Sequence, residues 1–263
     1  MRYQTVLAKG AVVGFVAGVA VALVACLGTR FGTFEYGRGI EVLIPGVAIG
    51  AGGLVAGLLW LGRALEANDS KGWRCGGVGL LGCALLVGIP ADHVWLAYSL
   101  PPIHDISTDI GDAPRFEMLL AWRDGASNPP SYDGPQIVTY GGERMTTALA
   151  QKYAYSDIKP MEKLNVFHAR VPLKEYYANQ FWRCLNTVNG LGWQVASFDL
   201  KSGHIEATDT SLWFGIVSDI VIRVRTAGPI GVRIDVRAKS RSGTADMGRD
   251  ATLVRDFLHA MPP

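Results

Sequence analysis

The first hundred residues of this 263-residue chain have few charged side chains. Of 25 basic and 23 acidic residues, 36 lie in residues 101–263 and only 12 in residues 1–100. The chain therefore divides into an apolar, glycine-rich part and a polar part. After the apolar runs about 160 residues remain, which is enough for a soluble domain with its own hydrophobic core.

Cysteine is also scarce, with four in the chain. Cys26, Cys75 and Cys83 lie in or beside the apolar runs, so Cys184 is the single cysteine of the polar part. An internal disulfide in that domain is therefore excluded. We interpret Cys184, on the apolar face of a predicted helix, as a small hydrophobic residue rather than a nucleophile.

Strong net charge and recognisable catalytic motifs are both missing. The whole chain has a net charge of +2, and residues 101–263 contain 18 basic and 18 acidic side chains, which argues against a nucleic-acid binder. The sequence contains no P-loop, nucleotide-binding glycine fingerprint, nucleophile elbow or paired-cysteine metal motif. We therefore expect no cofactor and no metal, and a non-catalytic role is favoured while enzymatic activity stays open.

Three apolar runs predict membrane helices. Gly10–Thr29 has no charged residue in 20 positions, and Val42–Gly62 and Cys75–Ala91 are similar. We predict a transmembrane bundle over residues 1–100, with helices at about 7–29, 42–63 and 75–98. Alternatively, Leu23–Cys26 is a lipoprotein processing box whose cleavage would remove the first run, although two further spans already anchor the chain.

The distribution of basic residues predicts an orientation. Five basic residues flank the predicted cytoplasmic ends and two lie in the other loop: Arg2, Lys9, Arg63, Lys71 and Arg74 against Arg30 and Arg38. Because cytoplasmic loops are enriched in Lys and Arg, the N-terminus is expected in the cytoplasm. Three crossings then place residues 101–263 in the periplasm, if the membrane is the inner membrane of a Gram-negative bacterium.

Small residues recur on the predicted membrane helices and suggest close helix packing. The two stripes comprise Gly10, Gly14 and Gly18 on the first helix and Gly46, Gly50, Gly53 and Gly57 on the second. Such stripes let helices approach closely. They either pack the three helices on one another or present one face to a membrane-protein partner, besides the lipid bilayer itself.

The polar part is predicted to be an α+β domain over residues 101–263. Residues 103–145 are rich in Pro, Gly, Asp and Ser and predict a long ordered loop around the domain, with a short strand at Gln136–Tyr140. Periodicity then predicts two helices flanking a four-stranded antiparallel sheet. The helices are Leu173–Asn189 and Ala245–Met261, and the strands are about Trp193–Leu200, His204–Thr208, Val217–Thr226 and Gly231–Lys239. The helices are expected on the apolar face of the sheet.

Period-two alternation places charged side chains on the other face of this sheet. They are His204, Glu206, Arg223, Arg225, Arg233, Asp235, Arg237 and Lys239. One interpretation is a solvated face with cross-strand ion pairs. The other is an arginine-lined site for phosphate or carboxylate groups of lipid headgroups, an envelope polymer or an acidic partner.

Histidines and carboxylates from two segments offer a further candidate site. His104, Asp105 and Asp109 would join His204, Glu206 and Asp209 if the loop folds over the sheet. Such a cluster could hold a metal or perform acid–base chemistry, although nothing in the spacing requires it. The candidate ligand- or partner-binding residues are Arg223, Arg225, Arg233, Arg237, Arg241, His104, Asp105, Glu206 and Asp209.

Four blocks over residues 101–260 resemble one known family. They are Pro101–Asp109, Ile205–Thr210 with Trp213–Gly215, Asp219–Arg223, and Asp235–Gly243 with Asp246–Gly248. In this order they resemble the domain of unknown function 1499, whose pattern usually has serine at Ala238 and asparagine at Asp250. The resemblance implies an envelope-associated domain, often behind membrane helices, and implies no catalytic residues.

These observations favour an accessory or structural subunit of a membrane or envelope assembly, without catalysis, whose outer domain binds a partner or an anionic envelope component. Two alternatives stay open. The first is an enzyme acting on envelope lipid or glycan, and the second is a carrier with an apolar cavity between the sheet and the C-terminal helix.

Overall fold

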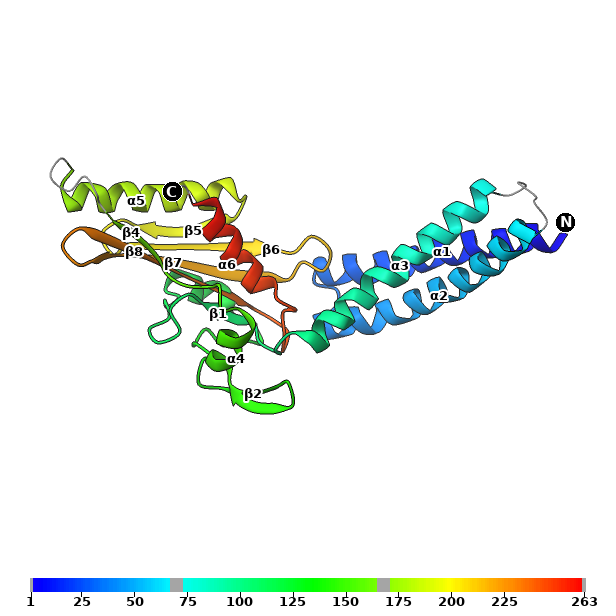
Figure 1. Ribbon diagram of the computed structural model, residues 1–263, viewed down its shortest axis with the longest axis horizontal. Helices are drawn as coiled ribbons and strands as arrows, with labels where there is room; N and C mark the ends of the chain where they lie inside the picture. The colour runs from blue at the N-terminus through cyan, green and yellow to red at the C-terminus, as the bar shows by residue number, and fades with distance from the viewer. Residues whose placement is uncertain (1, 67–72, 165–170, 262–263) are drawn as a thin grey trace. The chain divides into compact units, whose positions relative to one another are not determined.

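The computed structural model describes residues 2–66, 73–164 and 171–261 and contains two compact units (Figure 1). The first unit comprises Met1–Leu96 with Leu212–Gly215. The second comprises Ala97–Ser211 with Ile216–Pro263. A bundle of three apolar helices is therefore followed by an α+β domain, as the composition predicts.

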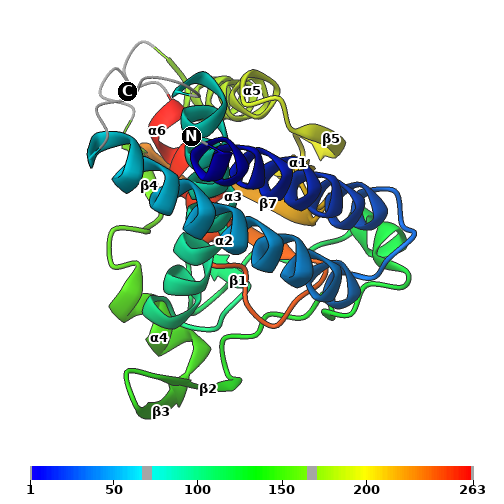
Figure 2. The ribbon, with the colours of Figure 1, turned by 90° about the vertical axis from the view of Figure 1, so that its right-hand side faces the viewer.

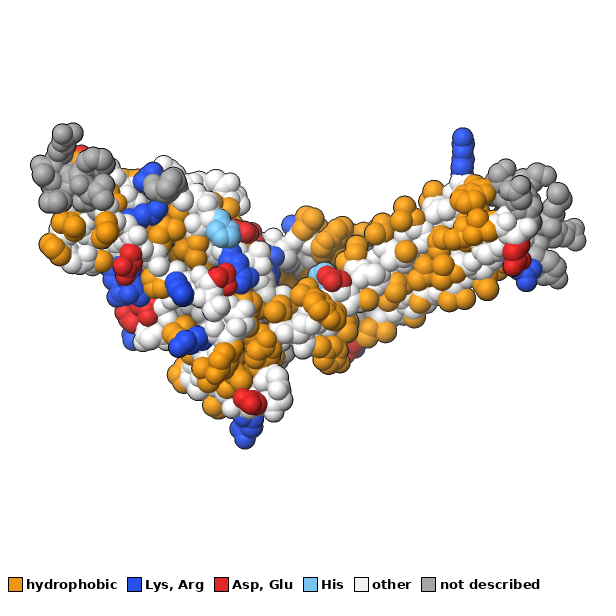
Figure 3. Space-filling model, viewed as in Figure 1, with side chains coloured by type: hydrophobic (Ala, Val, Ile, Leu, Met, Phe, Trp, Pro, Cys, Tyr) orange, Lys and Arg blue, Asp and Glu red, His pale blue; other side chains and the backbone are white. Residues whose placement is uncertain are grey.

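The first unit is built from three long helices. They are α1 (Arg2–Arg30), α2 (Tyr36–Glu66) and α3 (Trp73–Ser99). Each is long and apolar enough to span a membrane, and hydrophobic side chains lie along their visible outer surface (Figure 3). Figure 2 shows α1 and α2 running side by side along their length. We therefore treat the chain as a membrane protein.

The predicted glycine stripes lie at contacts between these helices. A Cβ atom added to Gly14 would come within 2.7 Å of the Gly53 Cα on α2, and one added to Gly53 would come within 2.6 Å of the Cys83 Sγ on α3. The same holds for the remaining five, because a Cβ at any of them would lie within 4 Å of another helix: Gly10, Gly18, Gly46, Gly50 and Gly57. The stripes pack the bundle internally. Their use by a second membrane protein stays a prediction.

The second unit contains a six-stranded antiparallel sheet. Its strands are β1 (Asp105–Ser107), β4 (Met161–Leu164), β5 (Gln194–Asp199), β6 (His204–Thr210), β7 (Val217–Ala227) and β8 (Gly231–Ser240). The order is β1-β8-β7-β6-β5, and β4 also pairs with β8. The four predicted strands are confirmed as β5 to β8. The sequence missed β1 and β4, which at three and four residues are too short to show alternation.

The apolar face of the sheet packs against two helices, α5 (Leu173–Gly190) and α6 (Arg249–Ala260) (Figure 1). The shared core contains Phe181 and Cys184 from α5, Phe257 from α6 and Ile220 from β7, all with no exposed surface. Burial raises the pKa of the Cys184 thiol to about 12, so the thiol stays protonated and packs as a hydrophobic group. The predicted placement of both helices is confirmed.

The segment between β1 and β4 contains small elements, most of which the sequence predicted as loop. They are the 3₁₀ helix η1 (Met118–Arg123), the hairpin β2 (Ile137–Tyr140) and β3 (Glu143–Thr146), and α4 (Thr147–Ala154). The predicted helix at Ala245–Met261 begins later, at Arg249. The reason is the backbone before it, because Met247 and Gly248 have φ angles of 54° and 81° and cannot continue a helix.

Candidate functional site

The charged face of the sheet is covered by the segment Thr108–Asp133. The strand register confirms the predicted alternation, with Arg223 opposite Asp235 and Val221 opposite Arg237. Phe116 and Leu119 of the covering segment form a small buried cluster with Val221. The face is therefore an internal layer of charge between the sheet and the covering segment, in contrast to the solvated surface that one interpretation expected.

At the centre of this layer Arg237 forms a two-point ion pair with Asp105. Its Nε donates to Asp105 Oδ1 at 2.7 Å and its Nη2 to Oδ2 at 2.8 Å, and both side chains are at most 1 % exposed. The remaining guanidinium hydrogens reach the carbonyl oxygens of Pro114, Pro130 and Ser131. The guanidinium carbon also lies 4.7 Å from the centroid of the Phe116 ring. Such complete pairing is what offsets the cost of burying an ion pair.

Lys239 extends this pairing toward His104. Its Nζ lies 2.7 Å from Asp133 Oδ2 and 3.3 Å from Asp105 Oδ2, and the side chain has no exposed surface. The His104 Nε2 lies 3.1 Å from the same Asp133 oxygen. Burial alone would raise the pKa of Asp133, but hydrogen bonds from His104 and Lys239 hold it below its usual value. Asp133 is therefore an ionised partner in the folded protein.

A further buried carboxylate, Asp219, is paired with two arginines. Arg241 donates from Nε and Nη2 to Asp219 at 2.8–3.1 Å, and Arg123 of η1 donates from Nη1 to the same carboxylate. Burial lowers the pKa of Arg123, and the charge of Asp219 opposes this shift. Asn128 completes the corner by donating to the carbonyl oxygens of Ser240 and Gly243 at 3.0 and 2.9 Å.

The outer part of the layer is a network of three arginines and three aspartates. The arginines are Arg223, Arg225 and Arg233, and the aspartates are Asp109, Asp112 and Asp235. Asp109 lies 2.6 Å from Arg233 and 2.9 Å from Arg225. Although burial would raise the pKa of Asp109, backbone N–H groups of Asp112 and Gly111 and the nearby arginine charges lower it. All three arginines therefore already have acidic partners.

The two remaining predicted acids are paired elsewhere. Glu206 lies 2.9 Å from His204 and accepts the backbone N–H groups of Glu117 and Leu119. These hydrogen bonds overcome the effect of burial and lower the pKa of Glu206. Asp209 pairs with Arg249 at the start of α6. In the described ranges, no three His, Cys, Asp or Glu side chains are grouped so that they could hold a metal ion.

The structure thus places all nine predicted binding residues in ion pairs or hydrogen bonds within the domain, and their ligand-binding role stays a prediction. Sequence reasoning missed the partners supplied by the covering segment, Asp112, Arg123 and Asp133. A usable signal was the acidic excess of residues 101–219, which have fourteen acidic and ten basic side chains, against three and eight in residues 220–255. The acidic excess of residues 101–219 therefore offsets the basic excess of residues 220–255.

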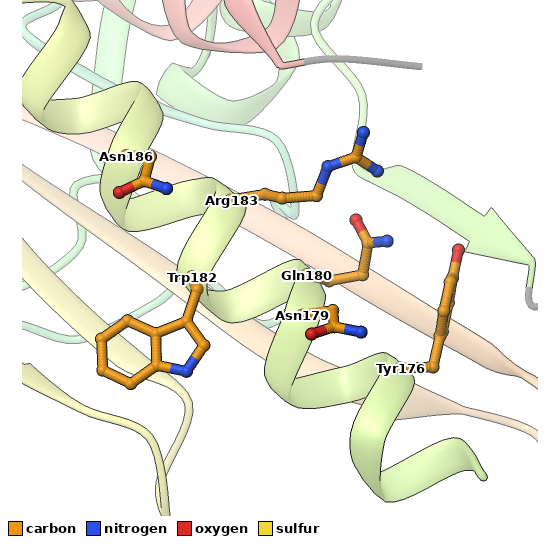
Figure 4. A pocket seen from close by; sticks show the side chains of 6 residues that line it. All are labelled: Tyr176, Asn179, Gln180, Trp182, Arg183 and Asn186. Atoms are coloured by element: carbon orange, nitrogen blue, oxygen red, sulfur yellow. The ribbon is translucent and has the colours of Figure 1, made fainter. Parts of the chain in front are cut away.

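An open depression lies instead along the outward surface of α5. It has a volume of about 470 Å³ and is lined by Tyr176, Asn179, Gln180, Trp182, Arg183 and Asn186. Figure 4 shows Tyr176, Gln180 and Arg183 projecting to one side of the helix and Trp182 to the other. We call this the α5 depression. Its lining combines three carboxamides and one guanidinium with two aromatic rings and contains no carboxylate, so polar and apolar surface contribute about equally.

Comparison with known proteins identifies the domain. Residues 105–261 match the family described as Protein of unknown function (DUF1499). The chain belongs to this family. No curated protein and no solved structure matches it. The resemblance inferred from the four blocks is therefore confirmed, and the ion-paired layer and the α5 depression are both features of a DUF1499 domain.

The DUF1499 domain also contains a carboxyl pair at the start of α6. Asp250 is fully buried and accepts hydrogen bonds from the Ser240 N–H at 2.8 Å and the Ser240 hydroxyl at 3.0 Å. Its side chain also bonds the carboxyl of Asp246, which accepts the Asp250 N–H at 2.7 Å. Burial first, and then the Asp246 charge, raise the pKa of Asp250 well above its usual value. Asp250 therefore keeps its proton and donates to Asp246.

Replacing the buried arginine should be far more costly than replacing an exposed one. Arg237→Met leaves the Asp105 charge with only Lys239 beside it, so we expect the DUF1499 domain to lose about 3–5 kcal/mol of unfolding free energy. Arg225→Met, at a side chain that is 37 % exposed, should cost about 1 kcal/mol or less. Denaturant unfolding of the detergent-solubilised chain measures both, and equal losses would show that the buried pair has no special weight.

Asp250→Asn should change how stability depends on pH. Because the folded pKa of Asp250 is raised, its stabilising contribution is complete below the unfolded pKa of about 3.9 and is lost as pH rises through the folded pKa. Asparagine keeps an acceptor for Ser240 and a donor for Asp246 without needing a proton. The variant should match the wild type near pH 4 and become increasingly more stable toward pH 8.

Thermal unfolding between pH 4 and pH 8 measures this difference. Tyr155 is the same in both proteins, so subtraction removes its contribution, whereas Asp246 interacts strongly with Asp250 and the difference therefore reports the ionisation of the carboxyl pair. Asp256→Asn, at an exposed position of the same helix, is the matched control and should show no such divergence. A constant gap between Asp250→Asn and the wild type across this range would contradict the shared proton.

Proposed function

We propose that this protein is a membrane-anchored binding module without catalytic activity, whose DUF1499 domain lies outside the cytoplasm and holds an envelope component or partner along α5. One observation carries this proposal. The charged side chains of the sheet are paired within the domain, whereas the α5 depression is open and contains an arginine with no acidic partner among the described residues.

The ion-paired layer is the internal layer of charge between the sheet and the covering segment. It supports this choice, because a ligand that bound there would have to displace existing contacts. Arg237, Lys239 and Arg123 are at most 3 % exposed and are held by carboxylates and carbonyl oxygens of the covering segment. An anion entering there would need to break several charge-assisted hydrogen bonds, each among the stronger interactions in a folded protein. A role in fixing the covering segment to the sheet is the simpler use of these residues.

The enzyme and carrier alternatives have weaker support. His104, Asp105, Glu206 and Asp209 are each paired with a different set of partners, so no shared reaction centre is favoured. Between the sheet and α6, side chains such as Val254, Phe257 and Ile222 are fully buried in one continuous core, which favours packing over a ligand cavity.

Placement outside the cytoplasm is inferred from the basic flanks and three crossings. A phosphatase reporter that is active only after export, fused after Pro263, should be active in cells. A second reporter that is active only in the cytosol should be inactive when it is fused at the same position. Activity of that cytosolic reporter would reverse the orientation and remove the envelope role.

Substitution of an exposed aromatic residue tests binding along α5. Trp182 is 43 % exposed in the α5 depression, and Trp122 is 47 % exposed on η1 outside it. Components that co-purify with the native protein under mild solubilisation should be lost from Trp182→Ala and retained by Trp122→Ala, because large aromatic side chains dominate binding surfaces. Equal retention by both variants, or no component with the wild type, would contradict the proposal.

A further inference from the structure

The α5 depression contains a buried hydrogen-bond acceptor that lacks a donor. Gln180 is 2 % exposed, and its Oε1 has no hydrogen-bond partner among the described residues. Gln180 lines the depression and projects to the same side of α5 as Tyr176 and Arg183, four residues before it and three after it (Figure 4). A buried acceptor without a donor is costly, so a ligand that donates a hydrogen bond here recovers that cost.

Positive charge lies beside this acceptor. Arg183 lines the depression and forms no ion pair with any described acidic side chain. Burial first, and then the charge of Arg183, lower the pKa of Lys163 on β4. The guanidinium of Arg183 is suited to a carboxylate or phosphate.

The rest of the lining matches a ligand with many hydroxyl groups. Asn179, Gln180 and Asn186 supply carboxamides, each of which can both donate and accept hydrogen bonds, as hydroxyl groups do. Trp182 offers an exposed aromatic face, and the Tyr176 ring is held in place by a hydrogen bond from its hydroxyl to the Leu164 carbonyl at 3.2 Å.

We infer that the α5 depression binds an acidic saccharide, with its carboxylate or phosphate on Arg183 and one of its hydroxyl groups donating to Gln180 Oε1. This inference rests on the proposed function, because it names the chemistry of the component held along α5. It uses residues that lie outside the ion-paired layer, and none of them is among the binding residues that the sequence suggested.

The test measures binding to the full chain in phosphatidylcholine nanodiscs by calorimetry. The probes are trigalacturonate, the neutral maltotriose and inorganic phosphate, and a further sample replaces part of the phosphatidylcholine with phosphatidylglycerol. Trigalacturonate should bind the wild type. Maltotriose should bind with an affinity at least roughly tenfold lower, because the charge-assisted contact is missing. Phosphate alone should also be weaker, since it lacks the hydroxyl contacts.

Two variants and one control locate the site. Arg183→Gln should weaken trigalacturonate binding by roughly tenfold or more, and Gln180→Leu should weaken it while leaving thermal stability intact, because it removes an unsatisfied acceptor. Lys174→Gln removes an exposed cation from the same helix outside the depression and should change binding less than twofold. Circular dichroism confirms that each variant is folded.

Each contrary outcome overturns the inference in a recognisable way. Equal binding of phosphate and trigalacturonate means a bare anion site, equal binding of maltotriose means that the charge is irrelevant, and binding only to phosphatidylglycerol means a lipid headgroup site. If no saccharide binds while Trp182→Ala still loses a native component, the saccharide chemistry is wrong and the proposed function stands. If neither occurs, both are wrong.

Discussion

The buried ion pair between Asp105 and Arg237 is the interaction on which the α+β domain most depends. It joins the short edge strand β1 to β8, and through the carbonyl oxygens of Pro114 and Pro130 it also holds the covering segment. Moving two such ions out of water costs several kcal/mol each, so the pair is tolerated only because nearly every donor and acceptor is satisfied. Removal of Arg237 would leave the buried Asp105 charge with only part of its compensation, from Lys239 and the Asp133 N–H.

This arrangement explains why an arginine-rich sheet need not be a binding surface. Arg241 and Arg123 neutralise Asp219, while Arg223, Arg225 and Arg233 share the carboxylates of Asp109, Asp112 and Asp235. The charges act as a polar core that fixes the register between a long loop and a sheet. We therefore propose α5 as the ligand site, because among the residues that the structure describes Arg183 has no acidic partner and the Gln180 Oε1 has no donor.

Packing in the helical unit follows a different physical rule. Lipid tails are as apolar as the helix surfaces, so helix association relies on close approach rather than on hydrophobic burial. Gly14 against Gly53 and Gly57 against Leu80 supply that approach, and larger residues at these positions would have to displace a neighbouring helix. The positions of the glycines in the two stripes are thus explained within a single copy.

Much of the fold could be predicted because its signals are local. The long apolar runs specified α1 to α3, and alternation along residues 217–239 specified β7, β8 and the face on which Arg223 and Arg237 lie. Turn and helix periodicity likewise placed α5. The start of α6 could not be predicted, because the positive φ angle of Met247 depends on the Asp246 and Asp250 contacts around it.

By itself the sequence determined the two-part organisation, the membrane helices, the sheet with one charged face, and membership of the DUF1499 family. Only the tertiary structure decided what that charge does. Whether Arg237 meets water, a ligand or Asp105 depends on where residues more than 100 positions away in the chain are placed. Local periodicity does not predict such contacts. It indicates which face of a strand or helix a side chain occupies, but not which segment covers that face.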